Sequence, residues 1–155
     1  MRIVFLIFIF LLAGNAYSQE AFKVDEYGNV PCDDYLGRMD GLFAESERNP
    51  TAKVYILLYE GKVPTYNYRT KRIELKRPIV GLAEARIRSI KRYADHRRFP
   101  KERLAFIKAG FRKEAALEAW IVPPGAKPPT PSETVPKMRY RPGKAAGYCV
   151  GCCLP

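Results

Sequence analysis

Four cysteines have the side chains and the spacing most directly suited to covalent chemistry. Cys149, Cys152 and Cys153 lie close together, whereas Cys32 lies more than a hundred residues before them. Four cysteines allow three disulfide connectivities. Bonds between neighbouring cysteines are sterically difficult, so Cys152 with Cys153 is the least favoured pair. A bond between Cys149 and Cys152 is feasible, and one between Cys32 and Cys153 would then fasten the C-terminal region to the start of the domain.

The same cysteines could in principle support two other chemistries. Together with His96, the three C-terminal cysteines have the side-chain types that bind zinc, but the second spaced pair of a zinc site is missing. A Cys-x-x-Cys redox centre would need a thioredoxin-like βαβ unit around it, and the sequence does not predict one. We therefore expect disulfide bonds, no metal site and no cofactor.

Catalytic motifs are absent from the sequence. The single histidine, His96, lies in Asp95-His96-Arg97-Arg98 at the predicted end of a helix, where the helix dipole favours positive charge. No serine lies in a nucleophile elbow, no phosphate-binding loop is present, and no carboxylate pair is placed by its spacing. We expect no catalytic residues, although an enzyme of a type without these motifs stays an alternative.

Residues 62–77 combine positive charge with two tyrosines. The basic residues are Lys62, Arg69, Lys71, Arg72, Lys76 and Arg77, and the only acid is Glu74. The sequence predicts an exposed loop with a short strand at 73–75. Its cations, Arg69, Lys71 and Arg72 among them, could bind an anionic polymer while Tyr66 and Tyr68 stack on sugar rings. The alternative, a solvated loop that only maintains the charge, is favoured by the basic character of the whole chain.

Hydrophobic periodicity predicts the elements around this loop in the order strand, helix, strand, helix, strand, strand. The first helix is capped by Asp33 or Asp34 and ends at Asn49-Pro50, and Gly81 opens the second helix. The strands are predicted at 22–24, at an edge; at 54–59, in the centre; and at 104–109 and 117–122, where a turn around Gly110 could make a hairpin.

The two ends of the chain differ from this central domain. Residues 1–18 have the pattern of a cleavable signal peptide: Arg2, an apolar run from Ile3 to Ala13, and the small residues Ala16 and Ser18. We expect a domain over 19–122, followed by a Pro-rich, basic tail at 123–155 that carries cysteines. The tail holds eight of the thirteen prolines and shows no periodicity, so we expect it to bury little surface.

Charge and export together narrow the class of partner. Removal of residues 1–18 leaves 137 residues with a net charge of +10, because Arg2 is the only charged residue removed. Such a charge attracts polyanions. In the periplasm or outside the cell these are envelope polymers, acidic glycans or anionic lipids, so no nucleic acid is expected. The apolar run is too short to span a bilayer, so no transmembrane anchor is expected after signal removal.

Several motifs of the predicted domain resemble the OmpA-like peptidoglycan-associated family. Asn49-Pro50 before Lys53-Val54-Tyr55-Ile56 is similar to that family's entry to its central strand, and Gly61 could match the glycine that follows. The segment from Leu82 to Tyr93 is similar to the helix motif LSxxRAxxVxxYL, and Leu117-Glu118 is similar to part of the terminal strand. The resemblance implies an α+β sandwich with a mixed four-stranded sheet and two helices on one face.

The resemblance also implies a ligand site. The family holds the diamino acid of the peptidoglycan stem peptide with an aspartate for the ammonium group and an arginine for the carboxylate. Arg86 matches that arginine, but the turn reads Glu60-Gly61-Lys62, so the aspartate is missing and Glu60 is its nearest substitute. If the site works, Arg86 is expected to face a cleft beside Gly61. An ordinary solubilising role on the helix surface is the alternative for Arg86.

Two non-enzymatic functions remain open on the sequence. The first is an envelope-associated module that binds peptidoglycan or another anionic envelope polymer. The second is a protein-interaction module that has lost the family's ligand site and binds another exported protein with its sheet edge or tail.

Overall fold

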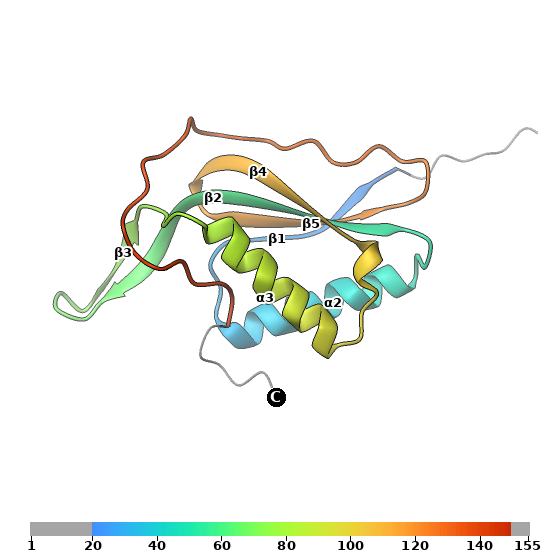
Figure 1. The fold of residues 1–155 in the computed structure, drawn as a ribbon, viewed down its shortest axis with the longest axis horizontal. Coiled ribbons are helices and arrows are strands. Elements are labelled where there is room, and N and C mark those ends of the chain that lie inside the picture. Colours follow the sequence, from blue (N-terminus) through green and yellow to red (C-terminus); the bar gives the residue numbers. More distant parts are fainter. Residues whose placement is uncertain (1–19, 150–155) are drawn as a thin grey trace, which may run out of the picture.

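The computed structural model describes residues 20–149 (Figure 1). The predicted signal peptide and two of the cysteines, Cys152 and Cys153, lie outside these residues. The elements are β1 (Phe22–Tyr27), α2 (Cys32–Glu47), β2 (Lys53–Asn67), β3 (Arg72–Lys76), α3 (Leu82–His96), the short 3-10 helix η1 (Lys101–Arg103), β4 (Leu104–Glu114) and β5 (Ala116–Val122). The predicted α+β class is confirmed.

The strand β2 is the centre of the sheet. It pairs in parallel with β4 on one side and antiparallel with β5 on the other, and β1 pairs antiparallel with β5 at the edge. The sheet is therefore mixed, as expected. It has five strands rather than four, because β3 pairs antiparallel with the far half of β2.

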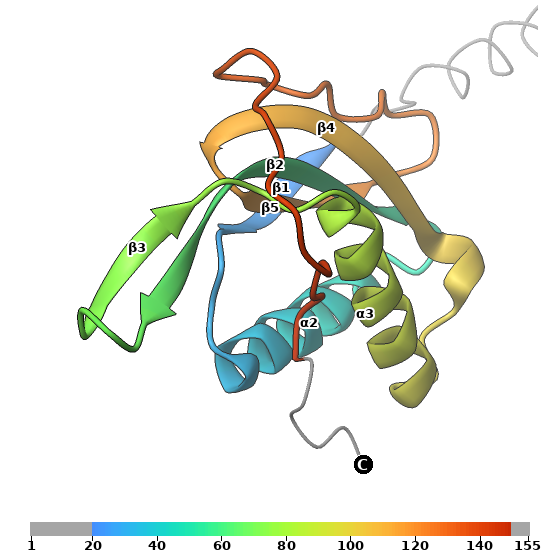
Figure 2. The same cartoon turned by 60° about the vertical axis from the view of Figure 1, so that its left-hand side comes forward.

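Both helices lie on the same face of the sheet (Figures 1 and 2). Val54, Ile56 and Leu58 share one face of β2, since side chains alternate along a strand, and they pack in the core with both helices. The apolar stripe of α3 contributes Ile90 and Tyr93 to this core. This layer arrangement agrees with the expected two helices on one face.

The predicted hairpin of the last two strands is wrong. β4 and β5 lie on opposite sides of β2, and the chain changes side within a single residue, Ala115. There Ala115 N donates to Lys62 O (2.9 Å). Gly110, expected at the turn, instead lies inside β4 at φ 81°, where pairing with β2 is irregular. Periodicity detects strands but not which strands pair with each other.

The predicted loop at residues 62–77 is also different in the structure. β2 continues beyond Lys62 to Asn67, turns, and returns as β3, so the segment is a β-hairpin rather than a loop. It projects away from the body of the domain (Figure 1). The many basic residues obscure the strand signal, which is the alternation of apolar and polar side chains. Its apolar members are Pro64 and Tyr66 in β2 and Ile73 and Leu75 in β3.

The residues after β5 form an extended C-terminal segment (residues 123–149) that packs on the domain. It crosses beside β4 and ends against α2 and α3 (Figure 2). Tyr148 is buried in the main core at 4 % exposure. The expectation that the tail buries little surface therefore fails at Tyr148, although most residues from 124 to 146 are exposed. The buried contacts come from single residues, which produce no periodicity.

Candidate functional site

Arg86, the arginine matched by the family motif, lies on α3 but does not face an open cleft. It is 2 % exposed. Its guanidinium lies 4.7 Å from the centroid of the Tyr148 ring, and Nη2 donates weakly to Asn29 Oδ1 (3.5 Å). Nη1 has no hydrogen-bond partner within residues 20–149. The C-terminal segment thus covers the position where the resemblance predicts a ligand.

Tyr148 is held in this position by an aromatic ring of α2 and by the close approach of its neighbour to α3. Its ring stacks on that of Tyr35 with centroids 4.6 Å apart. The preceding residue, Gly147, lies so close to α3 that a Cβ there would overlap Ser89 Oγ and Ala85 O. Burial raises the pKa of the Tyr148 hydroxyl, so the neutral form is the stable one.

The next residue, Cys149, forms a disulfide with Cys32 at the start of α2. This pairing differs from the predicted bonds of Cys149 with Cys152 and Cys32 with Cys153. It also removes Cys149 as a zinc ligand. Among the described residues no cluster of His, Cys, Asp or Glu is arranged to hold a metal ion. The spacing of cysteines cannot show which of them reaches Cys32, because that depends on the path of the whole C-terminal segment.

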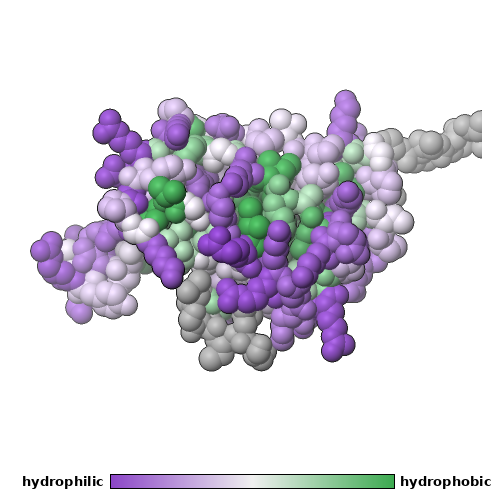
Figure 3. All heavy atoms as spheres, viewed as in Figure 1, coloured by the Kyte–Doolittle hydropathy of each residue, from purple (hydrophilic) through white to green (hydrophobic). Residues whose placement is uncertain are grey.

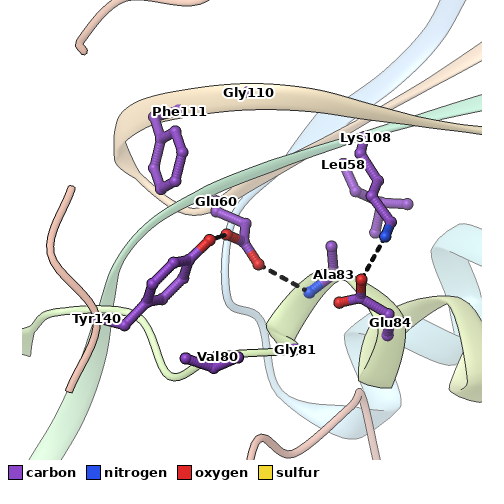
Figure 4. A pocket seen from close by; sticks show the side chains of 10 residues that line it. All are labelled: Leu58, Glu60, Val80, Gly81, Ala83, Glu84, Lys108, Gly110, Phe111 and Tyr140. Carbon is purple, nitrogen blue, oxygen red and sulfur yellow. Dashed lines mark hydrogen bonds and ion pairs between the residues drawn. The ribbon is translucent and has the colours of Figure 1, made fainter. Parts of the chain in front are cut away.

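Glu60 lies in a different place from Arg86, at the N-terminus of α3. Its Oε1 accepts from Ala83 N (3.3 Å), and its Oε2 accepts from the Tyr140 hydroxyl (Figure 4). The carboxylate thus satisfies a helix N–H that has no partner within the helix. Burial and the Glu60 carboxylate raise the pKa of Tyr140 to about 12.

A pocket of about 340 Å³ lies beside Glu60, between β4 and the start of α3 (Figure 4). Its charged side chains are already paired with the protein itself: Glu60 with Tyr140, and Lys108 with Glu84. Arg86 is not among its lining residues. The pocket therefore offers no free cation to the carboxylate of a zwitterionic ligand.

Gly61 has a structural role instead of lining this pocket. A Cβ there would lie 2.5 Å from Arg112 O and 2.6 Å from Ala115 N, in the connection from β4 to β5. The connection can cross β2 only where β2 has no side chain. The three residues suggested by the resemblance, Arg86, Glu60 and Gly61, are thus not brought together in one cleft.

The polymer-contact residues of the hairpin, by contrast, are brought together. Tyr66 and Tyr68 meet edge to face with centroids 5.0 Å apart. Arg69, Lys71 and Arg72 follow at the turn, and all three are exposed. The tip of the hairpin is hydrophilic on the side visible in Figure 3. The structure therefore places aromatic and basic side chains together on a projecting element.

A buried ionic cluster on the other face of the sheet was not anticipated from the sequence. Arg112 bonds to Glu118 (2.5 Å), and its guanidinium lies 3.6 Å from the centroid of the Tyr59 ring. Burial lowers the pKa of Arg112, but the hydrogen bond to Glu118 and the charges of Tyr59, Glu118 and Glu26 together outweigh burial, so the pKa is raised. Ser132 belongs to the same cluster: Arg112 Nη2 donates to Ser132 Oγ (2.6 Å), and Ser132 N donates to Tyr59 Oη (3.0 Å). The cluster anchors the C-terminal segment to the sheet. Its only signal in the sequence is the acid Glu118 inside the apolar run 117–122.

Comparisons with protein-family models, with curated proteins and with solved structures found no match. Within residues 20–149, neither helix has the length and apolar character needed to cross a membrane.

Proposed function

We propose that this chain is an exported, non-enzymatic module that associates with an anionic component of the cell envelope through the β2–β3 hairpin. The observation that carries the proposal is the hairpin itself. It projects from the domain and presents three exposed cations beside two exposed tyrosines. A projecting cationic element can approach a polyanion without desolvating the rest of the protein.

The covered state of Arg86 supports contact through the hairpin rather than through the family's ligand site. A bidentate contact with a carboxylate needs free access to the guanidinium. Tyr148 and the Cys32–Cys149 disulfide close that access. Peptidoglycan binding in the family's manner would require the end of the C-terminal segment to leave α3.

Export is supported by two independent features. The signal-peptide pattern at residues 1–18 predicts it. The disulfide in the described part of the chain is of the kind that persists in oxidising compartments such as the periplasm or the extracellular space.

The proposal is tested by co-sedimentation of the purified protein with isolated cell envelopes at low and at high salt. Binding should fall steeply with salt, because the charges involved are exposed and screened. The triple variant Arg69→Gln, Lys71→Gln, Arg72→Gln should bind at least about tenfold more weakly. The matched control is Arg88→Gln, Lys91→Gln, Arg92→Gln, which removes three exposed cations from α3.

Equal losses in the two triple variants would contradict the proposal, because attraction would then depend on net charge alone. The second candidate, a protein-interaction module, is favoured by the outer edge of β4. Among the described strands β4 pairs only with β2, and among the described residues its backbone hydrogen-bonds to the C-terminal segment at Phe111 alone. Retention that is insensitive to salt and to both variants would favour this function, since strand addition relies on backbone hydrogen bonds.

A further inference from the structure

The projecting hairpin is amphipathic. Residues directly opposite each other in an antiparallel pair project to the same face. Tyr66 is opposite Ile73, and Pro64 is opposite Leu75, so these four side chains share one face. Tyr68 joins them through its contact with Tyr66. The hairpin therefore has one continuous apolar and aromatic face.

This apolar face is open to solvent. Ile73 is 71 % exposed, Leu75 43 %, Tyr66 46 % and Tyr68 78 %. Exposed aliphatic side chains that adjoin each other on a projecting element indicate a surface that is covered by a partner.

Apart from Val63, the opposite face of the hairpin is polar, and its single carboxylate is paired within the hairpin. Asn67 donates to Glu74 (2.6 Å), and Thr70 Oγ1 also donates to Glu74 (3.2 Å). Lys76 adds an ion pair to the same carboxylate (3.9 Å). The only acid of the hairpin is thus compensated on the polar face, and it presents no negative charge beside Ile73 and Leu75.

The remaining charge of the hairpin is positive. Arg69, Lys71 and Arg72 surround the tip, and none of their side chains forms a salt bridge with a described residue. A partner that accepts this element must combine negative charge with an apolar interior. Tyrosine rings are favoured at an interface where one side is apolar and the other wet.

An anionic lipid surface meets these requirements better than a glycan does. Sugar rings stack on tyrosine faces, but they offer no apolar volume to Ile73 and Leu75. A bilayer offers headgroup phosphates to the cations, the interfacial zone to the tyrosines and the acyl boundary to the aliphatic side chains.

Resting on the proposed function, we infer that the β2–β3 hairpin docks onto an anionic bilayer, with Ile73 and Leu75 entering the acyl boundary and the tip cations contacting lipid phosphates. This inference names the anionic envelope component as a lipid surface. It predicts attachment that depends both on charge and on apolar insertion.

The experiment measures binding of the full chain to vesicles of phosphatidylglycerol with phosphatidylethanolamine, to vesicles of phosphatidylcholine alone, and to isolated peptidoglycan sacculi. We expect binding to the anionic vesicles only. The charge variant Arg69→Gln, Lys71→Gln, Arg72→Gln should weaken it on the order of a hundredfold. The variant Ile73→Ser, Leu75→Ser should weaken it about tenfold or more, whereas the control Phe22→Ser, at a partly exposed aromatic residue of β1, should not.

A direct readout of insertion comes from Tyr68→Trp. Its fluorescence should shift to shorter wavelength on anionic vesicles, and the parent protein with Trp120 in β5 serves as the background. All variants should keep the thermal midpoint of the parent, because the changed side chains are exposed.

The outcomes separate the inference from the proposed function. Binding to sacculi but not to anionic vesicles would overturn the lipid inference and leave envelope association standing. Binding to vesicles that is unaffected by Ile73→Ser, Leu75→Ser would overturn it as well, because attachment would then be purely electrostatic. Binding to neither would overturn both.

Discussion

Arg86 is a buried cation that contacts an aromatic ring rather than a carboxylate. The guanidinium is 2 % exposed, lies over Tyr148 and leaves Nη1 without a partner among the described residues. Burial of an uncompensated charge is costly, and apolar replacement of buried ionic groups is often neutral or stabilising. Arg86 therefore contributes less to stability than its burial suggests.

We expect Arg86→Met to change the free energy of unfolding by less than about 1 kcal/mol, or to increase it. Met fills a similar space and needs no hydrogen bonds. By contrast, Tyr148→Ala should cost about 3 kcal/mol or more, because it leaves a cavity beside Tyr35. Urea unfolding measures both values. A loss above about 3 kcal/mol for Arg86→Met, with Arg88→Met neutral, would show that Arg86 has an ionic partner outside residues 20–149.

The sequence motifs placed Arg86 on the correct helix, but they could not show which residues surround its side chain. Position on α3 follows from local periodicity, which the structure confirms. What covers the side chain is Tyr148, sixty-two residues further along the chain. Such a contact has no local signal, so neither the closure of the site nor the choice of Cys149 as the partner of Cys32 could be predicted.

At the scale of elements, the crossing of β2 by the β4–β5 connection depends on Gly61. A side chain at this position would overlap backbone atoms that cannot move independently of the two strands. The requirement explains why a glycine interrupts a strand in which it would otherwise be unfavourable. It also explains why β4 and β5 can flank β2 although they are adjacent in sequence.

We expect Gly61→Ala to lower the free energy of unfolding by about 2 to 3 kcal/mol, because backbone of β4 and β5 must shift. The matched control is Gly41→Ala in α2, where a Cβ meets nothing within 4 Å. That change should stabilise by about 0.5 to 1 kcal/mol through helix propensity. Equal effects of the two changes in urea unfolding would contradict the crossing geometry.

The order of elements could be read from the sequence, whereas strand pairing and length could not. The run 54–59, which is apolar on both faces and rich in β-branched and aromatic residues, predicts a central strand, and it is central. The extension to Asn67 was hidden, because six cations in residues 62–77 are typical of a solvated loop. The hairpin shows instead that the cations Arg69, Lys71 and Arg72 surround its tip, whereas the apolar side chains share one face of its strands.

At the scale of the whole molecule, the C-terminal segment is attached to the domain at two distant points. Ser132 is bound by the Arg112–Glu118 cluster on one face of the sheet, and Cys149 is bonded to Cys32 on the other side, beside the helices. The disulfide joins residues 117 positions apart. A crosslink that closes so long a loop removes much conformational freedom from the unfolded chain.

We expect Cys32→Ser and Cys149→Ser each to lower the free energy of unfolding by about 2 to 5 kcal/mol. Cys152→Ser and Cys153→Ser should each leave it within about 0.5 kcal/mol of the parent protein. Substitution is needed for this assignment, because cleavage after Lys144 leaves Cys149, Cys152 and Cys153 in a single tryptic peptide. Urea unfolding under oxidising conditions measures the four variants, and full reduction should bring all of them to one common lower value. A large loss for Cys153→Ser with none for Cys149→Ser would restore the pairing of Cys32 with Cys153 and would free the end of the C-terminal segment from its position over Arg86.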